Sequence, residues 1–258
     1  MSTRPVRLLA AAALFLALST FVFAEGESEK PSGVRVVAAE NIYGDLVQQI
    51  GGVHVRVLSI ISDPNVDPHE YEANVDNARQ IADADVIIEN GGGYDTWMDK
   101  LMATTQNSRR TLIQAYDLAP THLRQNEHVW YNPDNVVVIS QRIREVLKAR
   151  DPTHGAEFDT NFVSLKSEIA KLDERLRDLK ARYAGIPIAL TETIFLYQSD
   201  LIGLSVLTPW PFEKAIAEGN DPSPADAITA QQQITGRLAR ILVHNVQTVT
   251  PITTKLQQ

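Results

Sequence analysis

The sequence has no cysteine, no excess of basic charge and no long apolar run beyond residue 24. Without cysteine there can be no disulfide and no thiol for lipid attachment, so the hydrophobic core must stabilise the fold by itself. A net charge of −8 gives no basic surface for nucleic acid. No segment after residue 24 has the roughly 20 apolar residues of a membrane span. What remains is an ordinary globular composition and a length that suits two modest domains.

The first 24 residues have the pattern of a secretory signal peptide. Arg4 and Arg7 precede an apolar stretch over residues 8–24, which is interrupted at Ser19 and Thr20 and ends in a small residue, Ala24. The alternative is an uncleaved membrane anchor. Residues 25–33 are polar and predict a flexible leader. We therefore expect an exported, periplasmic protein that acts as a monomer.

Strands and helices alternate over the next part of the chain, residues 34–150. Runs rich in valine and isoleucine predict strands at 34–39, 55–61, 85–89 and 111–115. Periodic segments between and after them predict helices at 43–50, 75–82, 97–102 and 135–149. Continuous apolar strands between helices are typical of a parallel sheet that is covered on both faces, which defines an N-terminal α/β lobe.

A single long helix is expected to follow, within residues 151–184. Apolar residues recur at three- and four-residue steps from Phe158 to Leu179, and proline is absent from 154–183. Thirty helical residues would extend about 45 Å. A coiled-coil segment is the alternative, but its place between two α/β regions favours a linker joining two lobes. The smaller second lobe, 185–258, should have strands at 186–191, 205–208 and 240–244 between helices at 195–202, 222–238 and 249–257.

Three loops that follow strands carry the candidate ligands. His69 stands among four carboxylates, His128 is followed by two aromatic residues, and Glu192 follows the first strand of the second lobe. Ligands of open parallel sheets bind beyond the carboxyl ends of the strands. Imidazole and carboxylate together suit borderline divalent metals. Taken together, these residues predict a metal site between two lobes.

Each of these residues also has an ordinary structural interpretation. His69 could be an idle surface histidine, His128 could lie beside core aromatics, and Glu192 could cap a helix. The other histidines are weaker candidates, although His122 lies near His128 in the sequence. We also expect each ligating histidine to donate its second ring N–H to an acceptor that fixes its orientation.

Several segments resemble the zinc/manganese solute-binding proteins of bacterial ABC transporters, in order and over nearly all of residues 34–258. They are Asp67-Pro-His-Glu-Tyr-Glu72, Asn90-Gly-Gly-Gly-Tyr-Asp-Thr-Trp-Met98, Glu127-His-Val-Trp-Tyr-Asn-Pro-Asp-Asn135, Thr191-Glu-Thr-Ile-Phe195, Ala217-Glu-Gly-Asn-Asp-Pro-Ser223 and Asn245-Val-Gln-Thr-Val-Thr-Pro251. The resemblance implies an α/β fold of two lobes, each with a mostly parallel sheet flanked by helices, joined by one long linker helix. It also implies that His69, His128 and Glu192 bind Zn²⁺ or Mn²⁺ as cargo for a membrane permease.

The sequence departs from the family at its C-terminal end. Such proteins usually continue with another strand and helix, which supply a fourth, acidic ligand, whereas this sequence stops at Gln258. The second lobe therefore looks incomplete by comparison. Asp67, Glu70, Glu127, water or a second oxygen of Glu192 could complete the coordination. The ligands do not decide between zinc and manganese, although an oxygen-rich set favours manganese.

Other functions fit the sequence less well. A metallohydrolase would need an open coordination position and a general base, and the His-Glu-x-x-His, Gly-x-Ser-x-Gly and phosphate-loop motifs are absent. A receptor for haem or a metal–siderophore complex would need a wide aromatic or arginine-lined cleft. An adhesin-like surface protein with an incidental metal site is a third alternative. We therefore predict a binding protein rather than an enzyme.

Overall fold

The structure is a computed structural model that describes residues 33–63, 65–105 and 107–258. The predicted signal peptide, 1–24, and all of the predicted leader except Gly33 lie outside the described residues. Within the described residues, no helix has both the length and the apolar character to cross a membrane.

The first sheet has four parallel strands in the order β2-β1-β3-β4. Their bounds are β1 Val34–Glu40, β2 Val55–Ile61, β3 Val86–Glu89 and β4 Thr111–Gln114. Side chains alternate along the central strand: Val36 packs in one core, and Val37 packs in a second core on the other face. Burial on both faces explains why the inner strands β1 and β3 are almost continuously apolar.

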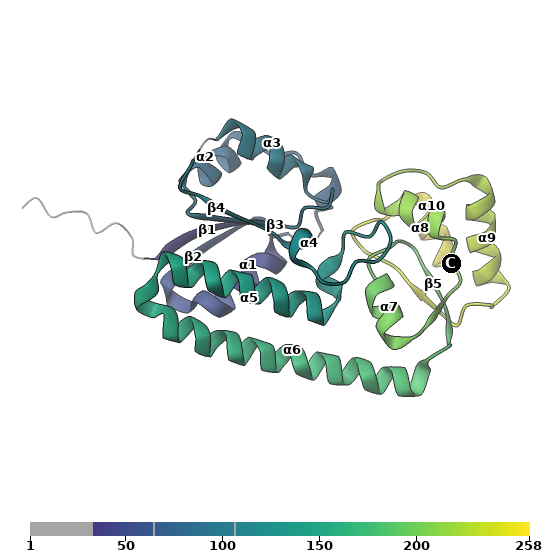
Figure 1. Cartoon of the computed structure of the whole chain (residues 1–258). Helices are drawn as coiled ribbons and strands as arrows, with labels where there is room; N and C mark the ends of the chain where they lie inside the picture. The colour runs from purple at the N-terminus through teal and green to yellow at the C-terminus, as the bar shows by residue number, and fades with distance from the viewer. Residues whose placement is uncertain (1–32, 64, 106) are drawn as a thin grey trace, which may run out of the picture. The chain divides into compact units, whose positions relative to one another are not determined.

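Helices cover both faces of this sheet (Figure 1). On one face lie α1 Asn41–Gly51, α5 Pro133–Arg150 and the start of α6 Gly155–Tyr183, and on the other lie α2 Val75–Asp83 and α3 Thr96–Thr104. The single turn α4 Ala115–Leu118 directly follows β4. The side chain of Asn132 caps α5, with Oδ1 accepting a hydrogen bond from the backbone N–H of Asp134 at 2.9 Å.

The second sheet has three parallel strands in the order β6-β5-β7. Its elements are β5 Pro187–Leu190, α7 Leu196–Ile202, β6 Ser205–Val206, α8 Trp210–Ala217, α9 Pro224–Thr235, β7 Ile241–Val243 and α10 Pro251–Leu256. Helices α8, α9 and α10 enclose a small core around Phe212. Gly203 ends α7 in the left-handed conformation, with φ of 74°, which glycine adopts without steric cost.

Helix α6 connects the two sheets and runs along the length of the molecule (Figure 1). Its apolar stripe is buried at Phe158, Phe162 and Leu165, against α1 and α5. Near its other end Leu176 is also buried, but Leu172 is 44% exposed. The stripe is therefore buried mainly where each lobe covers it, and the segment between is open to water.

The predicted two-lobe α/β fold with a linker helix is confirmed, and every predicted strand and helix is present within a few residues. Helix α8 was not predicted. Pro211 stands in its first turn, where no backbone N–H is needed. The lobe boundaries at 150/151 and 184/185 stay a prediction, since residues 33–258 form one compact unit by their contacts.

Candidate metal centre

Two hydrogen bonds hold the loop that carries His69. It leaves β2 and forms a single turn, Pro68–Glu70, in which the backbone N–H of His69 donates to Asp67 Oδ1 at 3.0 Å. The indole Nε1 of Trp97, on α3, donates to the carbonyl of Pro68 at 3.1 Å. One carboxylate oxygen of Asp67 therefore caps this turn.

The orientation of His128 is fixed by Asn126. Both residues are buried, and Asn126 Oδ1 lies 3.0 Å from the backbone N and 2.9 Å from the ring Nδ1 of His128. An amide oxygen only accepts, so the proton must reside on Nδ1, and Nε2 keeps a free lone pair. This is the orienting hydrogen bond expected for a ligating histidine, here supplied by a neutral amide.

Aromatic rings enclose the two imidazoles. The ring of Tyr94 lies 4.6 Å from that of His69 and 5.5 Å from that of His128, measured between centroids. Trp130 lies 5.3 Å from His128. Tyr94 follows three glycines that all have positive φ, and a side chain at Gly92 would collide with the ring of Tyr116. The glycine run therefore permits the close loop that carries Tyr94 to the site.

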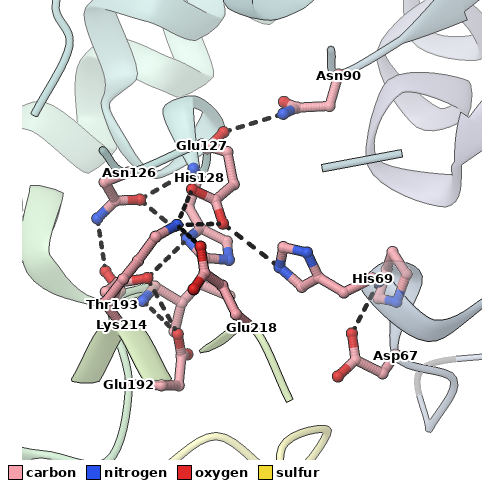
Figure 2. A network of polar contacts seen from close by, with 12 residues as sticks. Asp67, His69, Asn90, Asn126, Glu127, His128, Glu192, Thr193, Lys214 and Glu218 are labelled. Carbon is pink, nitrogen blue, oxygen red and sulfur yellow. Dashed lines mark hydrogen bonds and ion pairs between the residues drawn. The ribbon is translucent and has the colours of Figure 1, made fainter. Parts of the chain in front are cut away.

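The structure brings His69, His128 and Glu127 together (Figure 2). One ligand atom from each lies within 4.8 Å of the others, a separation from which small side-chain movements could close on one ion. His69 Nε2 is 3.5 Å from Glu127 Oε1 and has no hydrogen-bond partner among the described residues. Glu127 was one of the alternatives that the sequence left open for completing the coordination.

Glu192 lies at the same place but outside this close set. It follows β5, is 2% exposed, and its Oε2 accepts from the backbone N–H of Ile194 at 2.7 Å. The hydroxyl of Thr193 lies 3.5 Å from Glu192 Oε2 and 3.4 Å from His128 Nδ1, so a single side chain separates the two groups. The other carboxylate oxygen, Oε1, is buried without a hydrogen-bond partner among the described residues.

Lys214, on α8, reaches the site from the second sheet. Its Nζ lies 3.3 Å from Glu127 Oε2 and 3.2 Å from Glu218 Oε1. The side chain of Glu127 is only 6% exposed and that of Lys214 is 18% exposed. A buried carboxylate is usually paired with a cation or hydrogen-bonded, and Glu127 has the ammonium group of Lys214 as its ion-pair partner.

Burial controls the charge of the site. It lowers the pKa of His69 and lowers the pKa of His128 well below its usual value, and Lys214 and the other imidazole act in the same direction on His128. Both rings are therefore neutral at neutral pH, the form that binds metals. Burial also raises the pKa of Glu192 to about 7, opposed by the hydrogen bond from Ile194.

Comparison with known proteins identifies the family. The profile of the family described as zinc-uptake complex component A, periplasmic (ZnuA), matches residues 36–258. The chain belongs to this family. The ZnuA match includes both sheets, the linker helix and all three loops of the site, so it confirms the resemblance deduced from the motifs.

Individual relatives agree with the ZnuA assignment. The chain is 27% identical to the iron-binding protein YfeA of Yersinia pestis, with the match covering 79% of this chain and 70% of the relative. It is 26% identical to the manganese ABC transporter substrate-binding lipoprotein PsaA of Streptococcus mitis, over 76% and 69% of the two chains. These names describe binding components rather than enzymes, as expected.

A solved structure has the same fold. The periplasmic metal binding protein of Candidatus Liberibacter asiaticus superimposes with a TM-score of 0.71 at 21% identity, covering 86% of this chain and 83% of that chain. The two chains therefore share one fold.

Sequence reasoning did not identify Lys214, Asn126 or Tyr94 as parts of the site. No feature of the sequence pointed to Lys214, because the helix that carries it was not predicted. Asn126 stands two residues before His128, a spacing that suits an Asx-type hydrogen bond to the backbone, and that signal could have been used. Tyr94 lay in a segment used only for the family resemblance.

Proposed function

We propose that this protein binds one divalent transition-metal ion outside the cytoplasmic membrane and delivers it to the permease of an ABC importer. His69, His128 and Glu192 are the proposed ligands, and Glu127 is a further carboxylate donor. The observation that carries the proposal is the convergence of His69, Glu127 and His128 within 4.8 Å in a buried, aromatic-lined place. Family membership supports the transport role.

The donor set is suitable for the metals named among the relatives. Two neutral imidazoles with carboxylate oxygens are borderline ligands, which accept Zn²⁺, Mn²⁺ or Fe²⁺ with different preferences. Relatives are named for iron and manganese, and the family is named for zinc. We leave the choice among these three cations to experiment.

Lys214 brings a positive charge to the site. Its ammonium group lies 3.3 Å from Glu127 Oε2, where the positive charge balances the buried carboxylate in the absence of metal. A divalent ion bound by Glu127 would replace this pairing, leaving Lys214 with Glu218. Because Lys214 lies on helix α8 of the second lobe and Glu127 lies in the first lobe, metal capture would change a contact between the lobes, which a permease could sense.

The pocket beside the site favours a bare ion over an organic chelate. It is lined from both sides by Tyr94, Trp130, Ile194 and Gln247, with a volume of about 130 Å³. Pockets for drug-sized ligands are typically about 300–1,000 Å³. A haem or a siderophore complex would need the lobes to separate, whereas a single cation would not.

Metal titration of the apo protein and its variants tests the proposal. In competition with a chromophoric chelator, the parent chain should bind Zn²⁺ or Mn²⁺ in the cleft, and His69→Ala and His128→Ala should each weaken that binding at least a hundredfold. His122→Ala is the matched control, because that imidazole packs on Tyr116 outside the cluster. Cleft binding that survives in both His69 and His128 variants would refute the ligand assignment.

A further inference from the structure

A second group of metal-ligating side chains lies at the opposite edge of the first sheet. It consists of His54, Asp151 and His154, and one ligand atom from each lies within 4.8 Å of the others. His54 directly precedes β2, at the amino end of the strand, whereas the cleft residues follow the carboxyl ends. The two groups are therefore on opposite sides of the lobe.

Three separate segments supply these side chains. His54 ends the turn between α1 and β2, Asp151 follows the last residue of α5, and His154 is the cap residue of α6. Glu157, in the first turn of α6, adds a second carboxylate, with Oε2 at 2.9 Å from His54 Nε2. The junction of α5 and α6 is where the linker helix begins, and from there the helix runs back along α5 (Figure 1).

The geometry is that of paired imidazoles with one carboxylate each. The rings of His54 and His154 stack with centroids 3.6 Å apart and an interplanar angle of 14°. His154 Nδ1 lies 2.6 Å from Asp151 Oδ2. The His54 and Asp151 side chains are about one-fifth exposed and that of His154 is 40% exposed, so an ion can enter from solvent without any lobe movement.

Each stacked imidazole faces a carboxylate oxygen: His54 Nε2 lies 2.9 Å from Glu157 Oε2, and His154 Nδ1 lies 2.6 Å from Asp151 Oδ2. A divalent cation at this place would bind the ring nitrogens and the carboxylate oxygens together. Two histidines with one or two carboxylates are also a usual ligand set for Zn²⁺.

We propose that His54, Asp151 and His154, with Glu157 as a fourth donor, form a second, solvent-accessible site for a borderline divalent cation such as Zn²⁺. A bound ion would join the turn before β2 to the start of α6 and so fasten the linker helix to the first lobe. In the same region, Asn161 Nδ2 on α6 donates to the carbonyl of Ile50 on α1 at 3.0 Å, so α6 is already hydrogen-bonded to the first lobe here. The site is independent of the cleft ligands.

Zn²⁺ titration of the full chain by calorimetry tests the second site. The parent should bind two equivalents, of which the combined His54→Ala/His154→Ala variant loses one and the combined His69→Ala/His128→Ala variant loses the other. His244→Ala is the control, since this exposed imidazole belongs to neither group, and it should keep both equivalents. Zn²⁺ should also raise the Tm of the cleft variant, in which only the second site remains.

Two further variants protect the test from misfolding. His154→Asn and Asp151→Asn are smaller changes, and each should weaken the second equivalent at least tenfold while the circular dichroism spectrum stays that of the parent. A second equivalent that binds as tightly in these variants and in the His54→Ala/His154→Ala protein would overturn the proposal. The proposal would also be overturned if the parent chain bound a single equivalent and the cleft variant bound none. If the parent chain bound Zn²⁺ at the second site but not in the cleft, the proposed function would be contradicted and this site would stand.

Discussion

Asn126→Ala is the most informative single change in the cleft. Asn126 is fully buried, its Oδ1 receives hydrogen bonds from the backbone and ring of His128, and its Nδ2 donates to the carbonyl of Thr193 at 2.7 Å. It therefore orients a proposed ligand and joins the lobes at the same time. Removing it should affect both metal affinity and stability, by amounts that can be worked out separately.

The expected magnitudes follow from these three hydrogen bonds. Each is worth about 0.5–1.5 kcal/mol, so the free energy of unfolding of the apo protein should fall by about 1.5–4.5 kcal/mol. Loss of an orienting partner of a metal-bound histidine typically weakens affinity about 10–100-fold, or about 1.4–2.8 kcal/mol. Urea denaturation measures the first quantity, and chelator competition measures the second.

Asn126→Asp separates orientation from stability. A carboxylate at this position still accepts the ring N–H of His128, so metal affinity should remain near that of the parent. It no longer donates to the Thr193 carbonyl, so the free energy of unfolding should fall. If Asn126→Ala binds metal as tightly as the parent, or if Asn126→Asp binds as weakly as Asn126→Ala, the orienting role is refuted.

Two further predictions concern buried groups of the first lobe. Burial raises the pKa of Glu89 to about 8 from an ordinary value of 4.5, so its neutral form stabilises the fold fully below pH 4.5 and this contribution is lost as the pH rises towards 8. Glu89→Gln should flatten that slope and raise the free energy of unfolding at pH 8 by about 4 kcal/mol, measured by urea denaturation across this range. Trp97→Phe removes the hydrogen bond to the Pro68 carbonyl and should cost about 1–3 kcal/mol of stability, while weakening metal binding through the loop of His69, measured by denaturation and chelator competition.

Each of these two predictions has an outcome that would contradict it. Gln114 Nε2 donates to Glu89 Oε1 at 2.9 Å, and glutamine at position 89 retains that acceptor, so a loss of stability in Glu89→Gln at pH 8 would contradict the assignment. Trp210→Phe is the control for Trp97→Phe, because Trp210 Nε1 has no hydrogen-bond partner among the described residues. Equal effects of the two tryptophan changes would show that the hydrogen bond to Pro68 is unimportant.

The sequence determined the fold class because the relevant signals are local. Valine-rich runs, helical periodicity and the long stripe of α6 all depend on residues that are near one another along the chain. The same reasoning predicted His69, His128 and Glu192 as candidate ligands, because loops after parallel strands lie at the carboxyl edge of their sheet. Helix α8 escaped prediction because its opening residues, Pro209-Trp210-Pro211, are equally typical of a loop.

Only the tertiary structure decided which side chains actually meet. Glu127 rather than Glu192 completes the close set with the histidines, and Lys214 arrives from a segment 87 residues away to pair with it. His54 and His154 looked unremarkable in the sequence because 100 residues separate them, yet their rings stack. Contacts between distant segments depend on how the lobes pack and how each side chain is oriented, and local patterns in the sequence carry no record of either.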